Sequence, residues 1–218
     1  MKNKSNFIKI IAIMILFCLS SQVAAFADNI PPSNNDIIAY IDGIGLTKND
    51  INEDGEIKNM PKAMPKANIS GGGGATNRLP SGKSSALIQK RLGAPRFSQQ
   101  VDDYYMTVSQ AKDAAYALNS STVIKTVANT IVSNVVGSVA KHIAKPYSYI
   151  TMFSTLPRIS AGTKINNLTK KNKKVRLRII KNPRGTFYNV SEWDGRTLDF
   201  KLTNNNVTKE VIFNKQYR

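Results

Sequence analysis

Residues 173–193 read KKVRLRIIKNPRGTFYNVSEW and predict a β-hairpin. Val175, Leu177 and Ile179 alternate with arginines, and a period of two is typical of a strand with one buried face. The Asn-Pro-Arg-Gly sequence at 182–185 has proline second and glycine fourth, as in a type I turn. The pattern therefore predicts two antiparallel strands joined at this turn.

The sequence after this turn predicts more strands. Residues 186–193 form the second strand of the hairpin, and Asp194-Gly195 is a strong hairpin-turn signal. It leads to a third strand over 197–203, and a run of asparagines then leads to a fourth over 207–217. We expect a four-strand antiparallel β-meander with one face packed on helices.

Two amphipathic helices are expected before the meander. Apolar residues at steps of three and four predict the first over 100–118 and the second over 121–144, which ends at Lys145-Pro146. The lysines and asparagines of the second helix outweigh the insertion free energy of its valines and isoleucines, so it is not an autonomous transmembrane segment. It either packs in the core or lies in a membrane interface. Its membrane-contact candidates are Ile124, Val127, Ile131, Val135 and Val139.

Residues 1–27 have the layout of a secretory signal peptide. Three lysines are followed by a short apolar run and by Ala25-Phe26-Ala27, which places cleavage after Ala27. The apolar run is shorter than the roughly 20 residues that span a bilayer. We therefore expect a secreted protein that is extracellular or associated with the cell surface. Cleavage removes three lysines and lowers the formal charge from +17 to +14.

An acidic head over residues 28–56 contains the start of a calcium loop. Asp50, Asn52, Asp54 and Glu56 offer oxygens at alternate positions. The twelfth position, which should supply a bidentate carboxylate, is Pro61, so calcium is a weak possibility beside an acidic turn without metal. No other cofactor is expected.

Residues 57–98 predict a disordered basic linker, because prolines and four consecutive glycines leave little to bury. Gly82-Lys83-Ser84 is not a phosphate loop, since Asn77 stands where that motif needs glycine. Lys90-Arg91 is a possible processing site that would make the acidic head a propeptide. The alternative is an uncleaved flexible arm.

The fold class is therefore α+β: two amphipathic helices followed by a four-strand antiparallel β-meander, preceded by a disordered acidic and Gly/Pro-rich arm. The expected segments are the signal peptide (1–27), the acidic head (28–56), the linker (57–98), the helical segment (99–160) and the basic meander (161–218).

The composition excludes several kinds of enzyme. The chain has one Cys and one His, which excludes thiolate metal sites, disulfide scaffolds and multi-His sites. In the meander, Glu192 and Asp194 are close in sequence, but the hairpin turn already explains Asp194. We expect a protein without enzymatic activity and without a small-molecule substrate.

Positive charge is the strongest functional signal, because residues 141–191 contain twelve bases and no acid. The cluster is expected to begin in a flexible loop and to continue as a positive stripe on a strand. The predicted anionic-surface-binding residues are Lys170, Lys171, Lys173, Lys174, Arg176, Arg178, Lys181 and Arg184.

Two functions fit this charge. In the first, a cationic secreted protein perturbs anionic membranes or cell envelopes, in the manner of a toxin or antimicrobial protein, through the 121–144 helix. In the second, a binding or structural module adheres to an anionic extracellular polymer and perturbs no membrane. Export argues against nucleic acid as the partner. Ser133 and Gly137, four residues apart, make a homo-oligomer conceivable.

Overall fold

The computed structural model describes residues 36–41, 44–58, 60, 78–92, 97–137, 146–198 and 207–215. The chain divides into two units, Met1–Ile37 and Ile38–Arg218, and the architecture below is that of the second unit. The expected signal peptide with its cleavage site at Ala27, most of the Gly/Pro-rich linker and Val139 lie outside the described residues.

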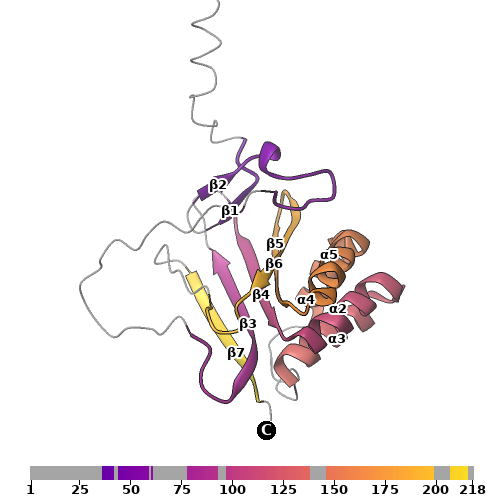
Figure 1. Cartoon of the computed structure of the whole chain (residues 1–218). Coiled ribbons are helices and arrows are strands. Elements are labelled where there is room, and N and C mark those ends of the chain that lie inside the picture. Colours follow the sequence, from indigo (N-terminus) through magenta and orange to yellow (C-terminus); the bar gives the residue numbers. More distant parts are fainter. Residues whose placement is uncertain are drawn as a thin grey trace, which may run out of the picture. The chain divides into compact units, whose positions relative to one another are not determined.

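The main sheet has five antiparallel strands in the order β6-β5-β4-β3-β7, and four helices connect β4 to β5 (Figure 1). A smaller sheet pairs β1 (Ala39–Ile41) with β2 (Ile44–Leu46), followed by the short helix η1 (Lys48–Asp50). The main-sheet strands are β3 (Lys83–Leu92), β4 (Gln99–Met106), β5 (Lys174–Asn182), β6 (Gly185–Trp193) and β7 (Val207–Lys215). The helices are α2 (Val108–Ser120), α3 (Ile124–Val136), α4 (Pro146–Thr155) and α5 (Arg158–Lys170).

The two faces of the main sheet are covered differently. The four helices pack on one face, which we call the helix face, around Leu87, Tyr104 and Leu177 (Figure 1). On the opposite face, β1, β2 and the loop after them form one apolar cluster with Val101, Ile180 and Phe187. A second cluster on that face joins Ala86, Ile88, Tyr105, Trp193 and Leu198. Both faces are therefore buried over much of the sheet.

The α+β class is confirmed, but the order of helices and then strands is not, because β3 and β4 precede the helices. The first half of the helix expected over 100–118 is strand β4. Tyr104 and Tyr105 point to opposite faces, and both are buried since β4 is central in the sheet. A strand that is buried on both faces shows no alternation, which explains the error. The helix begins after Thr107, whose side chain forms a capping box with Gln110.

The disordered linker expected over 57–98 is not confirmed either, because it contains strand β3. This strand pairs with β4 on one side and with β7 on the other. Leu87 points to the helix face, whereas Ile88 and Lys90 point to the opposite face, and all three are buried. The expected processing site at Lys90-Arg91 thus lies in a paired central strand, where a protease would need that strand to leave the sheet.

The hairpin of 173–193 is confirmed as β5 and β6, with Asn182 paired to Gly185 across the turn. Strands β3 to β6 lie side by side in chain order, so the sheet does hold a four-strand antiparallel meander, with helices inserted between β4 and β5. Its members differ from those expected, since β3 and β4 belong to it and β7 pairs with β3 at the far edge; residues 199–203 of the strand expected over 197–203 lie outside the described residues. Thr197 forms only an isolated bridge with Arg78.

Candidate functional site

Four of the predicted surface lysines form an exposed corner between α5 and β5. Lys170, Lys171, Lys173 and Lys174, which we call the lysine corner, are all exposed. The Lys173 ammonium lies 2.8 Å from Glu192 Oε1, and the Lys174 ammonium lies 5.9 Å from the centroid of the Trp193 ring. The corner therefore presents cations to solvent from the end of a helix and the start of a strand.

The two arginines expected to extend this surface belong instead to a buried ion cluster. Arg178 is 2% exposed, and its Nε and Nη2 donate to Asp103 Oδ1 and Oδ2 at 2.7 and 2.9 Å. Arg176 Nε donates to the same Oδ1 at 3.1 Å, and Lys90 Nζ lies 3.9 Å from Oδ2. The arginines of the positive stripe expected on this strand therefore pair with Asp103 inside the protein.

Asp103 stays ionised within this cluster. Burial alone would raise the pKa of this carboxyl, but Arg176, Arg178 and Lys90 hold it well below its usual range. Three cations, Arg176, Arg178 and Lys90, therefore surround this one carboxylate. The Arg176 guanidinium also lies 5.3 Å from the centroid of the Tyr105 ring.

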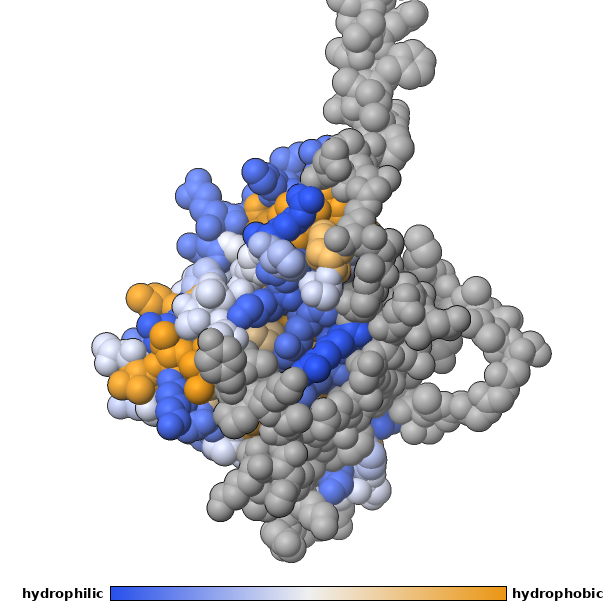
Figure 2. Space-filling model, turned by 180° about the vertical axis from the view of Figure 1, so that it is seen from behind, coloured by the Kyte–Doolittle hydropathy of each residue, from blue (hydrophilic) through white to orange (hydrophobic). Residues whose placement is uncertain are grey.

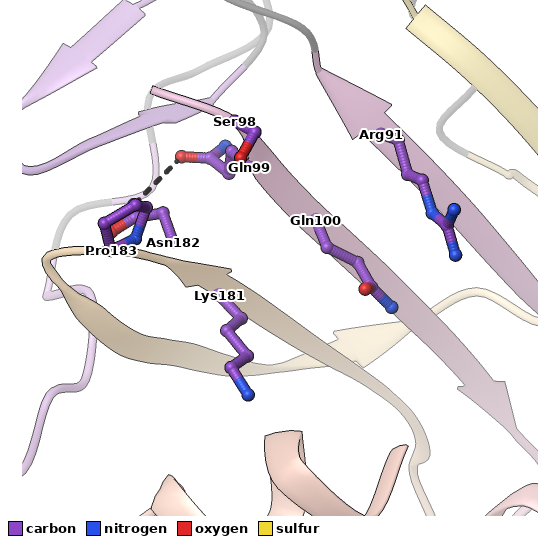
Figure 3. A pocket seen from close by; sticks show the side chains of 7 residues that line it. All are labelled: Arg91, Ser98, Gln99, Gln100, Lys181, Asn182 and Pro183. Atoms are coloured by element: carbon purple, nitrogen blue, oxygen red, sulfur yellow. Dashed lines mark hydrogen bonds between the residues drawn. The ribbon is translucent and has the colours of Figure 1, made fainter. Parts of the chain in front are cut away.

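The remaining two predicted cations lie at the opposite end of β5. Arg184 is exposed, with its guanidinium carbon 5.6 Å from the centroid of the Phe97 ring. Lys181 lines an open pocket of about 410 Å³, which we call the sheet-end pocket (Figure 3). Its lining residues are Arg91, Ser98, Gln99, Gln100, Lys181, Asn182 and Pro183.

Behind this pocket lies a carboxyl that the sequence did not single out. Asp102 is fully buried on the helix face and accepts hydrogen bonds from Gln89 Nε2 and Gln100 Nε2, each 3.2 Å from Oδ1. Burial raises the pKa of Asp102 to about 7, although both amide hydrogen bonds act in the opposite direction. Near neutral pH this side chain therefore exchanges a proton.

The residues proposed to bind calcium have other partners. Asp50 Oδ2 accepts from the Thr47 backbone N–H at 2.8 Å, and Asn52 Oδ1 accepts from the Glu56 N–H at 2.8 Å. The Glu56 carboxylate is paired with the Lys164 ammonium, and Asp54 is exposed. Within the described part of the chain, no three His, Cys, Asp or Glu side chains are grouped to hold a metal ion.

The calcium-like loop contacts the main sheet. Gly55 has a φ of 74°, and its carbonyl accepts from Tyr188 N–H at 3.0 Å, while Ile57 N–H donates to Tyr188 O at 2.8 Å. These contacts pair the loop with β6, which forms one edge of the main sheet. Covering an edge strand in this way hinders pairing with other chains.

The proposed membrane-contact residues lie in the core. Val127, Ile131 and Val135 are fully buried against the other helices and the sheet, and Ile124 is half-buried. Helix α3 ends at Gly137, which has a φ of 63°. None of the helices in the described ranges is long and apolar enough to cross a membrane.

Exposed apolar side chains are few in the described part of the molecule. The large ones are Tyr116, Val123 and Ile159, with exposed fractions of 75%, 57% and 73%. Arg158 Nη1 donates to Ser121 O at 2.8 Å, which holds the start of α5 against the end of α2. Figure 2 shows that hydrophilic side chains predominate between the apolar patches on the face that it displays.

Comparison of the chain with protein-family models, with curated proteins and with solved structures finds no match.

Proposed function

We propose that this protein is a secreted, non-enzymatic module that adheres to an anionic extracellular polymer through the lysine corner. The observation that carries this proposal is the exposure of all four lysines at one junction. Lys173 pairs with the exposed Glu192, and the other three lysines form no ion pair with a carboxylate of the described residues. Closely spaced ammonium groups bind polyanions by displacing counterions, without requiring a pocket.

The packing of α3 favours adhesion over membrane insertion. Its apolar residues, including Val127, Ile131 and Val135, form part of the main core. Inserting them into lipid would remove them from that core, and each fully buried aliphatic side chain contributes about 1.5–3 kcal/mol. Adhesion keeps the helix packed and needs no rearrangement.

Contact with an anionic membrane is the second candidate, favoured by Tyr116, Val123 and Ile159. Lys112 lies one helical turn before Tyr116, and Lys125 lies two residues after Val123. Both lysines are also exposed. Apolar side chains beside lysines suit the interface of an anionic bilayer. Such contact would leave α3 in the core.

The test compares two variants with the same loss of charge. One replaces Lys170, Lys171, Lys173 and Lys174 by Gln; the matched control replaces Lys48, Lys58, Lys112 and Lys125, which are exposed elsewhere. Binding to long-chain polyphosphate is measured over a range of salt concentrations. We expect the lysine-corner variant to bind at least about tenfold more weakly and with a shallower salt dependence, because fewer counterions are displaced.

Equal weakening in both variants would show that only net charge matters and would contradict the lysine corner as the binding site. Dye release from vesicles containing phosphatidylglycerol is measured in parallel. Release by the unmodified chain that is absent with phosphatidylcholine alone would favour the membrane candidate, whereas binding without release supports adhesion.

A further inference from the structure

The sheet-end pocket presents two cations in one cross-strand row. Arg91 of β3, Gln100 of β4 and Lys181 of β5 are register partners, so their side chains share the helix face of the sheet. Adjacent strands lie about 4.8 Å apart, which places Arg91 and Lys181 about 10 Å apart at their Cα atoms, with Gln100 between them. Figure 3 shows these three side chains extending from their strands in the same general direction.

The neighbouring wall of the pocket is held by hydrogen bonds. Gln99 Nε2 donates to Tyr40 O at 2.6 Å, and Gln99 Oε1 accepts from Tyr40 N–H at 3.0 Å. Asn182 Nδ2 donates to the same Oε1 at 3.3 Å and to Ile38 O at 2.9 Å. Both amides lie on the face of the sheet that β1 covers, so β1 fixes the ends of β4 and β5 from behind the cation row before any ligand binds, which lowers the entropic cost of binding.

The chemistry of the row suits an oxyanion. The planar guanidinium of Arg91 can donate two parallel hydrogen bonds to a phosphate or sulfate group, and the Lys181 ammonium supplies a compact charge opposite it. Burial lowers the pKa of Lys181, because the pocket replaces part of the water around its charge. An anion between the two cations would restore that lost stabilisation.

We propose that the sheet-end pocket binds one tetrahedral oxyanion, a phosphate or sulfate group, between Arg91 and Lys181. This site is distinct from the lysine corner, since Lys174 and Lys181 are separated by seven residues along β5, or about 23 Å. The inference therefore goes beyond the adhesion proposed above and does not depend on it.

Anion binding in the pocket is coupled to protonation of Asp102, because Gln100, which lines the pocket, donates a hydrogen bond to this carboxyl. A bound anion disfavours the charged form of Asp102, so binding is accompanied by proton uptake and is tighter at pH 6 than at pH 8. The charged or titratable groups near Asp102 are Arg91 of β3, Asp103 and Tyr104 of β4, Lys181 of β5 and Tyr149 of α4; in β7, Glu210 is the register partner of Gln89. The uncharged neighbours are Gln89, Gln100, Ile179 and Met152.

The experiment titrates the purified full chain with sodium sulfate against sodium chloride at constant ionic strength, with binding followed by NMR. Sulfate keeps its charge between pH 6 and 8, so any pH dependence comes from the protein. We expect saturable binding that weakens about tenfold in Arg91→Gln and in Lys181→Gln, since each removes a charge-assisted contact. The matched control Lys125→Gln removes an exposed lysine of α3 and should leave binding unchanged.

A second arm uses Asp102→Asn, which should bind sulfate at pH 8 as tightly as the unmodified chain binds it at pH 6. A third arm replaces sulfate by phosphate or acetate at pH 8; phosphate should compete with sulfate, and acetate should not. Absence of saturable binding, equal weakening by Lys125→Gln, or equal affinity for acetate would overturn the proposal. None of these outcomes would alter polyphosphate binding by the lysine corner, so the two proposals fail separately.

Discussion

Two adjacent carboxyls of β4 lie in opposite environments on the two faces of one strand. Asp103 is surrounded by Arg176, Arg178 and Lys90 and stays charged, whereas Asp102, its neighbour on the helix face, accepts hydrogen bonds from two amides and has a pKa of about 7. Both are fully buried. The difference shows that the partners of a buried carboxyl, more than its burial, decide whether it carries charge.

The comparison also separates two kinds of contribution to stability. The charge on Asp103 balances part of the positive charge of its cluster, so the cluster depends on it. Burial disfavours the charged form of Asp102, so the folded state is more stable when this group is protonated. The next three predictions test this contrast, from the largest expected effect to the smallest.

Replacing Asp103 by Asn should lower the free energy of unfolding by about 3–5 kcal/mol, because Arg178 loses its ion pair with Asp103 while remaining buried. Urea unfolding at pH 7 measures this loss. The double variant Asp103→Leu, Arg178→Met removes charge from both sides and should recover part of it. A single variant as stable as the unmodified chain would contradict the ionised state assigned to Asp103.

For Asp102, the sign of the pH dependence follows from a folded pKa of about 7 against 3.8 in the unfolded chain. As the pH rises, the unfolded state loses this proton before the folded state does. The stabilisation of the folded state by the protonated carboxyl is therefore fully present below about pH 4 and is lost as the pH rises through 7. Between pH 5 and pH 8, the free energy of unfolding of the unmodified chain should fall by about 2 to 3 kcal/mol relative to that of Asp102→Asn. Parallel pH profiles of the two proteins would conflict with this assignment.

The exposed ion pair between Lys173 and Glu192 should contribute least to the free energy of unfolding. Its side chains are 46% and 53% exposed, so water screens the attraction. Glu192→Gln should lower the free energy of unfolding by less than about 1 kcal/mol, and 1 M salt should abolish the difference. Urea unfolding at two salt concentrations measures it. A loss as large as that of Asp103→Asn would mean that burial does not distinguish the two ion pairs.

The parts of the fold that could be predicted from the sequence are those with local signals. The Asn-Pro-Arg-Gly turn fixes the hairpin of β5 and β6 within its own few residues. The central strands were missed: the prolines and glycines before β3 made its region look like a linker, and the apolar residues of β4, which is buried on both faces, fell at helical steps. Their ion pairs include partners more than seventy residues apart in sequence, such as Asp103 and Arg178, which no local pattern reveals.

The two candidate sites also differ in whether a local sequence pattern reveals them. The lysine corner is visible in the sequence as a run of bases, and the structure places those residues together at the surface; the flexible loop expected at its start is instead the end of helix α5. The sheet-end pocket is not visible there, because Arg91, Gln100 and Lys181 become neighbours only through the register of three strands. Arg176 and Arg178 are indistinguishable from surface arginines until Asp103 is placed beside them.

The pairing of β7 with β3 has a consequence for synthesis of the chain. On the ribosome, β3 and β4 emerge long before β7, so β3 lacks its outer neighbour until residues 207–215 have been made. During that interval its free backbone groups can pair with those of another nascent chain. Pairing between strands so distant in sequence is also intrinsically slow. A helper that holds the growing chain, or a delay of folding until the whole chain is available, would protect this protein from aggregation.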